Sequence, residues 1–180
     1  MVQKMKIVKY FLSILFCNAF RLLKFIPNND PIMGCLLPYS RQDKWWASAL
    51  FAFITMVSFD LITGMVGIWT LVTALTYAGL GILFHQIYKN KKKINLKTYL
   101  GSGILGVLIF DFITGPIMSS WMFQMPFETA FIGQIPFTLL HLASVGIFII
   151  ILTPLLDLHL INSKQMEDHK VWQKVLTFVK

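Results

Sequence analysis

Long runs of apolar residues, separated by short polar segments, dominate the pattern along the chain. Five such runs cover residues 7–23, 45–63, 65–88, 99–114 and 131–158. Each is long enough, or nearly so, to cross a bilayer, which takes about 20 residues as a helix. A sixth apolar stretch, residues 31–40, is shorter and contains two prolines. The pattern predicts an all-α membrane protein and leaves one question, whether the short stretch also crosses.

The distribution of basic residues favours a crossing. If residues 31–40 cross, the chain has six spans and both termini lie on one side, together with most of the lysines and arginines. That side holds Lys4, Lys6, Lys9, Arg41, Lys44, Lys89, Lys91, Lys92, Lys93, Lys97 and the basic tail. The other side keeps only Arg21 and Lys24. Without the crossing, the 89–97 cluster would lie outside, against the positive-inside bias. We therefore predict six transmembrane helices, the second one short, with both termini cytoplasmic.

The chain is predicted to divide into a transmembrane domain, residues 1–160, and a cytoplasmic tail, residues 161–180. In the tail, Asn162 and Gln165 match a capping box. An apolar stripe follows, formed by Val171, Trp172, Val175, Leu176 and Val179. The tail is predicted to form an interfacial helix on the anionic inner leaflet, with a solvated tail as the alternative.

Composition agrees with a membrane domain. Of 180 residues, 56% are hydrophobic and 13% charged, where soluble domains carry roughly 25% charged residues. The net charge of +8 lies in short clusters between the apolar runs, which favours membrane orientation over nucleic-acid binding. Cys17 and Cys35 fall inside apolar segments, so two buried thiols are expected and no disulfide framework.

An internal repeat marks two of the runs. Residues 59–64 read FDLITG, residues 110–115 read FDFITG, and a tryptophan follows each copy, Trp69 and Trp121. Gly64 and Gly115 suit the left-handed position after a helix end, and Pro116 would prevent continuation. The repeat predicts that both helices end here, at the outer face.

The repeated acids, Asp60 and Asp111, are unfavourably placed in such helix ends. A carboxylate in the last turn opposes the helix dipole by a few tenths to about 1 kcal/mol, and a charge near the hydrocarbon adds a further cost. Each acid therefore needs a partner, which a ligand, a backbone donor, or Trp69 and Trp121 would supply. The alternative is that both are structural acceptors that hold the outer loops.

Other polar residues are predicted at the same membrane depth as the repeated acids, near the outer face. The first outer loop contains Asn28, Asn29 and Asp30, and Glu128 lies in a later loop. On the last helix, Gln134, Thr138 and His141 have the spacing of one face, although a lone intramembrane histidine is usually a packed residue. A concave site with aromatic walls and convergent polar groups suits a small ligand. The predicted substrate-binding residues are Asn28, Asn29, Asp30, Asp60, Trp69, Asp111, Trp121, Gln134, Thr138 and His141.

Catalytic and nucleotide-binding signatures are absent from the sequence. It has no nucleophile elbow, no H-E-x-x-H, no C-x-x-C and no phosphate-binding loop. We therefore expect no enzyme, no catalytic or metal-ligating residues and no cofactor. Any ATP-driven work would fall to another chain.

Several segments carry a family resemblance. They are the stretch RLLKFIPNNDP at residues 21–31, the sequence GSG at residues 101–103, and QIPFT at residues 134–138. Together with six short spans over residues 7–158, they resemble the substrate-binding S components of energy-coupling-factor (ECF) transporters. One departure is that the first run has only Ala19, with Ser13 and Cys17, where many members carry an Ala-x-x-x-Ala docking motif.

The resemblance implies a function and partners. S components bind a vitamin or similar micronutrient near the outer face, and a transmembrane coupling subunit with two ATPase subunits drives its release inside. Residues 28–30 and 119–128 would act as lids over the ligand. The chain is thus expected to be the high-affinity binding subunit of an importer in the cytoplasmic membrane. Which ligand it binds is not readable, although the acids would suit amino or hydroxyl donors and the tryptophans a flat ring.

Three other classes compete with this interpretation. One is a purely structural assembly factor, which would not need the aligned polar face. A small secondary transporter, coupled to protons or cations, would explain intramembrane acids as an ion path, although such acids belong nearer mid-membrane. An intramembrane enzyme would need a clustered nucleophile or metal set, which His141 alone does not supply.

Overall fold

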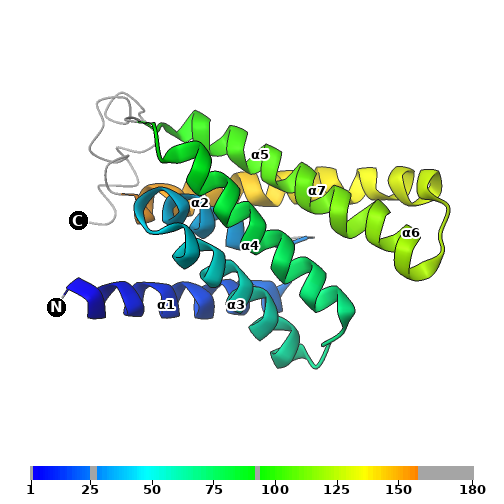
Figure 1. Ribbon diagram of the computed structural model, residues 1–180, viewed down its shortest axis with the longest axis horizontal. Coiled ribbons are helices and arrows are strands. Elements are labelled where there is room, and N and C mark those ends of the chain that lie inside the picture. Colours follow the sequence, from blue (N-terminus) through cyan, green and yellow to red (C-terminus); the bar gives the residue numbers. More distant parts are fainter. Residues whose placement is uncertain (1, 25–27, 92–93, 158–180) are drawn as a thin grey trace.

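The computed structural model describes residues 2–24, 28–91 and 94–157, and this part of the chain is all-helical (Figure 1). The elements are α1 (Val2–Leu23), α2 (Ile32–Gln42), α3 (Trp45–Thr63), α4 (Ile68–Tyr88), α5 (Leu96–Phe112), η1 (Ile113–Ile117), α6 (Met118–Phe123) and α7 (Phe127–Leu156). Because α5, η1 and α6 are continuous, the described residues form six helices and no strand. The predicted tail helix, residues 161–180, lies outside the described residues.

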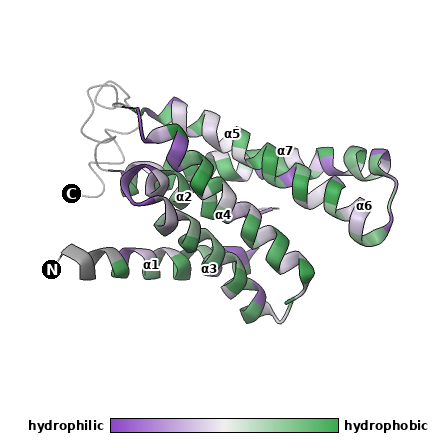
Figure 2. Ribbon diagram, in the orientation of Figure 1, coloured by the Kyte–Doolittle hydropathy of each residue, from purple (hydrophilic) through white to green (hydrophobic). Residues whose placement is uncertain are grey.

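Four helices of the described chain are long and apolar enough to cross a membrane. They are α3, α4, the continuous stretch Leu96–Phe123, and α7. Hydrophobic residues predominate along all four (Figure 2), and many point outward, with side chains such as Ile132 and Leu139 more than 60% exposed. An apolar surface of this extent suits lipid and not water. The chain is thus a multi-pass helical membrane protein.

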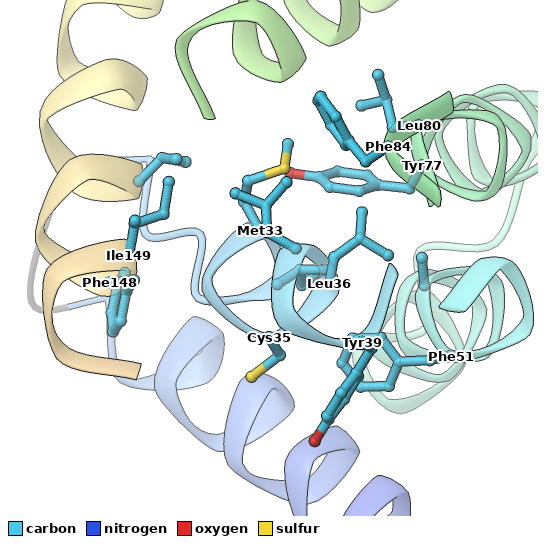
Figure 3. Packing of buried hydrophobic residues seen from close by; sticks show 14 of the residues in the cluster. Met33, Cys35, Leu36, Tyr39, Phe51, Tyr77, Leu80, Phe84, Phe148 and Ile149 are labelled. Carbon is cyan, nitrogen blue, oxygen red and sulfur yellow. The ribbon is translucent and has the colours of Figure 1, made fainter. Parts of the chain in front are cut away.

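The short second helix lies at the centre of the bundle. Every residue of α2 from Ile32 to Ser40 is buried, between α7 on one side and α3 and α4 on the other. Figure 3 shows Met33 and Leu36 packed between Phe148 and Ile149 of α7 and Leu80 of α4. Eleven residues span about 17 Å, roughly half of a hydrocarbon core. The short helix is confirmed, while the crossing of α1 and α2 stays a prediction.

Small residues allow α2 and its neighbours to approach closely. A Cβ atom on Gly34 would lie 2.8 Å from the Phe148 carbonyl oxygen, and one on Gly81 would lie 3.0 Å from the Ala49 backbone nitrogen. Cys17 and Cys35 face each other across α1 and α2, with their sulfur atoms 4.0 Å apart. Both thiols are free and buried, as the sequence predicts.

The two copies of the repeat end differently. Gly64 takes the left-handed conformation, with φ of 69°, and ends α3 as predicted. The prediction that Gly115 and Pro116 end a helix is wrong, because both lie inside the π-helical turn η1 and the helix continues to Phe123. A π turn holds one extra residue and so accommodates a proline, which lacks an N–H and crowds the preceding turn.

The chain direction brings several helix ends together. α1, α3 and the continuous stretch Leu96–Phe123 end at the side of the bundle where α4 and α7 begin (Figure 1). Residues 28–30 lie deeper in the bundle, where Asn28 and Asp30 bond to Phe137 and Ser144 of α7. These contacts place the candidate site.

Candidate functional site

A cavity of about 410 Å³ lies between the last turns of α1 and α3 and the middle parts of α4 and α7. Its lining comes from α1, the loop that follows it, α2, α3, α4, α5 and α7. The lining residues are Arg21, Lys24, Asn28, Asn29, Asp30, Ile32, Met56, Phe59, Tyr77, Phe110, Phe137 and His141. We call this cavity the α1–α7 pocket. Its volume lies within the range of small-molecule sites, about 300–1,000 Å³.

The loop between α1 and α2 is pinned to both walls of the pocket. The Asn29 amide donates to the Phe20 carbonyl oxygen over 2.5 Å and so satisfies one of the unpaired carbonyls at the end of α1. The Asn28 amide donates to the Phe137 carbonyl oxygen of α7 over 2.9 Å. Asn28 has φ of 55°, a left-handed conformation that asparagine tolerates better than most residues. The two asparagines thus fix the loop by their side chains.

Asp30 forms the floor of the pocket. One carboxylate oxygen accepts the Ile32 amide over 2.9 Å, which begins α2 with an Asx turn. The other accepts the Tyr77 hydroxyl and the His141 imidazole. Burial by itself would raise the pKa of Asp30, but the hydrogen bonds from His141 and Tyr77 outweigh it and hold the pKa below its ordinary value. Asp30 is a buried carboxylate in this loop with three protein donors.

His141 connects Asp30 to the second repeated acid. Its Nε2 lies 3.0 Å from an Asp30 oxygen, and its Nδ1 lies 2.8 Å from an Asp111 oxygen. His141 is 4% exposed and Asp111 2%. Both ring nitrogens can donate at once only in the imidazolium form. The arrangement joins α5, α7 and the α1–α2 loop through a buried ion-pair chain.

Aromatic rings form the walls. Phe110 and Tyr77 pack with their ring centroids 4.5 Å apart, and Phe110 and Phe137 each present an edge-to-face contact to His141. Phe59 lines the pocket from α3. Phe59 and Phe110 are the first residues of the two repeat copies, so in each copy the phenylalanine, rather than the aspartate, contributes directly to the same pocket.

Two cations lie at this pocket. Arg21 stacks its guanidinium 3.9 Å from the Phe59 ring centroid and donates to the Met56 sulfur over 3.3 Å. Lys24 follows at the end of α1 and is exposed. Within the described parts of the chain, neither cation has a carboxylate at ion-pair distance. The charge of Arg21 acts on the Asp30 carboxylate through space, but neither cation makes a direct ion pair with the described residues.

Three predicted site residues line a different cleft. Asp111, Gln134 and Thr138 lie in a cavity of about 530 Å³ between α5 and α7, whose other walls are apolar. The second carboxylate oxygen of Asp111 is buried there without a hydrogen-bond partner. Gln134 and Thr138 share a helix face with His141, but the three residues do not line the same cavity. Gln134 and Thr138 line the cleft between α5 and α7, and His141 lines the α1–α7 pocket.

The remaining predicted residues lie away from both cavities. Asp60 accepts the Thr70 hydroxyl over 2.5 Å, and Thr70 accepts the Gly67 amide over 3.1 Å, so this acid holds the α3–α4 turn. The Trp69 indole donates to the Met65 carbonyl oxygen in the same turn. Trp121 is 65% exposed on α6. Residues 119–128, a predicted lid, do not line the α1–α7 pocket.

Of the predicted site residues, Asn28, Asn29, Asp30 and His141 line the pocket. The other lining residues were not predicted. Arg21 and Lys24 carried a signal, since they are the basic residues that the positive-inside count leaves on the outer side. Tyr77 and the phenylalanines carried none, because an aromatic residue inside an apolar run has the same pattern whether it faces lipid or a cavity.

Neither cavity is built as a metal site. Among the described residues, no group of three or more histidines, cysteines and acids is arranged to hold a metal ion. Comparison of the chain with family models, with curated proteins and with solved structures gives no significant match.

Proposed function

We propose that this chain is the substrate-binding membrane subunit of an ATP-driven importer for a vitamin-like small molecule, of the ECF type. The observation that carries the proposal is the α1–α7 pocket, a cavity of about 410 Å³ with aromatic walls and convergent polar groups. It lies in the half of the bundle that the charge pattern assigns to the outside, with its floor about halfway along α4 and α7. A binding subunit needs such a pocket open toward the side from which its ligand comes.

The division of labour follows from what the sequence lacks. It has no phosphate-binding loop, so a transmembrane coupling subunit and two ATPase subunits would supply the energy. His141 bonds to two carboxylates and to no hydroxyl or thiol nucleophile, which favours binding over catalysis. The protein would work in the cytoplasmic membrane, with both termini inside.

The pocket can be tested without knowing its ligand. The protein is purified in mild detergent, and released small molecules are identified by mass spectrometry. Phe137→Ala opens the pocket wall, while Phe123→Ala removes a ring that is 66% exposed and lines neither cavity. We expect the same compound from the parent protein and Phe123→Ala and its loss from Phe137→Ala. Equal recovery from all three proteins would reject the pocket.

Energy coupling can then be measured with the identified compound. In proteoliposomes, the chain alone should bind the compound without accumulating it. Accumulation should appear when ATPase and coupling subunits from the same cell are added with internal ATP.

A secondary carrier is the second candidate, and one observation favours it. The Asp30–His141–Asp111 chain links the two cavities through groups that exchange protons, and buried ionisable residues in membranes often mark ion paths. Uptake by the lone protein, driven by a proton gradient and lost in Asp111→Asn, would favour this function over the importer.

A further inference from the structure

The carboxylate that lines the α1–α7 pocket, Asp30, already accepts the protein's own donors, and the two repeated acids each have one protein donor. Asp60 accepts from Thr70, and Asp111 accepts from His141. Asp30 accepts from Tyr77, His141 and the Ile32 amide. A ligand amine or hydroxyl would have to displace one of these bonds, at the cost of leaving a buried donor unpaired. In the α1–α7 pocket, Asp30 is therefore a poor acceptor for a ligand donor, while the second oxygen of Asp111 remains without a hydrogen-bond partner.

The two cations of the pocket, by contrast, make only weak contacts with the protein. Arg21 makes a ring contact and a hydrogen bond to sulfur, both weak compared with a carboxylate pair, and Lys24 is exposed. In the described chain neither has a carboxylate at ion-pair distance. An arginine held beside an apolar wall favours a planar, bidentate anion such as a carboxylate or phosphate.

The charge pattern gives an independent reason. The bias that assigns the basic clusters to the inside leaves Arg21 and Lys24 as the two exceptions, and both line the same pocket. By contrast, Arg41, at the other end of α2, forms an ion pair with Asp157. Two basic residues that lie against the orientation bias, and that make no ion pair with a described carboxylate, are explained if an anionic ligand is the partner.

Resting on the proposed function, we infer that the α1–α7 pocket takes an organic anion, a small molecule with a carboxylate or phosphate group on a flat apolar body. Arg21 and Lys24 hold the anionic group at the pocket mouth. The body lies among Phe59, Phe110 and Phe137, above the Asp30–His141 floor. The same field excludes amines, because two cations repel them and the floor offers no free acceptor charge.

The test compares small probes that share one ring and differ in charge. Fluorine NMR titrations of the full-length protein in detergent use para-fluorobenzoate, para-fluorophenyl phosphate and para-fluorobenzylamine. We expect either anion or both to bind and the amine to bind more weakly. Removing one charge-assisted contact, by Arg21→Gln or Lys24→Gln, should raise the Kd of the bound anion about ten- to a hundredfold.

Matched variants separate charge from folding. Lys97→Gln removes an exposed lysine at the opposite end of the bundle and should leave the anion Kd unchanged. Arg21→Lys keeps the charge and should retain the preference for the anion over the amine. Without ligand, Arg21→Gln should unfold at a temperature similar to that of the parent protein if the substitution affects only binding. A carboxylate-only or phosphate-only response would support the inference and name the anionic group.

The failures are distinguishable. Preferred binding of the amine, or an anion Kd unchanged in both Arg21→Gln and Lys24→Gln, would overturn the anion assignment. If the bound probe were still lost in Phe137→Ala, the assignment of the pocket and the proposed importer function would remain supported. Binding of no probe, or binding insensitive to Phe137→Ala, would overturn the pocket itself and with it both proposals.

Discussion

The acid of the first repeat copy, Asp60, has a structural partner. Its carboxylate accepts the Thr70 hydroxyl, which in turn accepts the Gly67 amide, so three residues fix the turn between α3 and α4. The acid is 9% exposed, and a buried hydrogen bond of this kind stabilises because its loss strands the remaining partner. The helix-dipole cost of a carboxylate in the last turn is offset locally.

Asp60→Ala should therefore lower the free energy of unfolding by about 1–3 kcal/mol, because the buried Thr70 hydroxyl loses its acceptor. Thr70→Val should lower it by a similar amount. Detergent-induced unfolding of both variants and of the double variant measures this. In the double variant the two effects should be less than additive, and strict additivity would contradict the bond.

Substitution of His141 should lower the free energy of unfolding more than substitution of Asp60. His141→Ala leaves Asp30 and Asp111 buried and without their shared cation, a change typically worth about 3–5 kcal/mol. Adding Asp111→Asn should restore part of the loss, because it removes one of the stranded charges. The measurement is again detergent-induced unfolding. No restoration in the double variant would show that the ion-pair chain does not carry this stability.

At the scale of elements, α2 depends on its close approach to α7. Its residues from Ile32 to Ser40 are all buried, and Gly34 meets the Phe148 carbonyl. Backbone atoms cannot move aside as a flexible side chain can, so this contact fixes how deeply α2 sits. Because Asp30 begins α2, the position of the helix also sets the floor of the pocket.

Gly34→Ala should lower stability by about 1–3 kcal/mol, since the new methyl would overlap backbone. Gly79→Ala is the matched control, because a Cβ there meets nothing within 4 Å. This control should be neutral or stabilise by about 0.5–1 kcal/mol, as alanine favours a helix over glycine. Unfolding of the two variants compares them directly, and equal effects would contradict the close approach.

At the scale of the whole molecule, the alternation of basic clusters with apolar helices predicts orientation. Reporter fusions after Lys91 and at the C-terminus should both report a cytoplasmic location. A fusion within the α3–α4 turn, at Met65, should report the opposite side. Different locations for the first two fusions would reject six crossings and turn the pocket toward the wrong side of the membrane.

The apolar runs alone largely determined the fold class. In lipid, the backbone N–H and C=O groups of such a run can be hydrogen-bonded within the run only if it is a helix. The long helices of the described chain therefore follow from the positions of the apolar runs. Gly64 was likewise readable, since a glycine after an apolar run is a common helix end. These features are local, and local chemistry decides them.

Tertiary structure decided which residues meet. The same FDxITG signal ends one helix and continues through a π turn in the other, where Gly115 packs against the Gln134 side chain of α7. The polar face of α7 borders two cavities, and the repeated acids bond to protein groups. The sequence determined that polar groups gather in one half of the bundle, while packing decided which of the described charged groups pair with one another, because that depends on contacts between helices far apart in the chain.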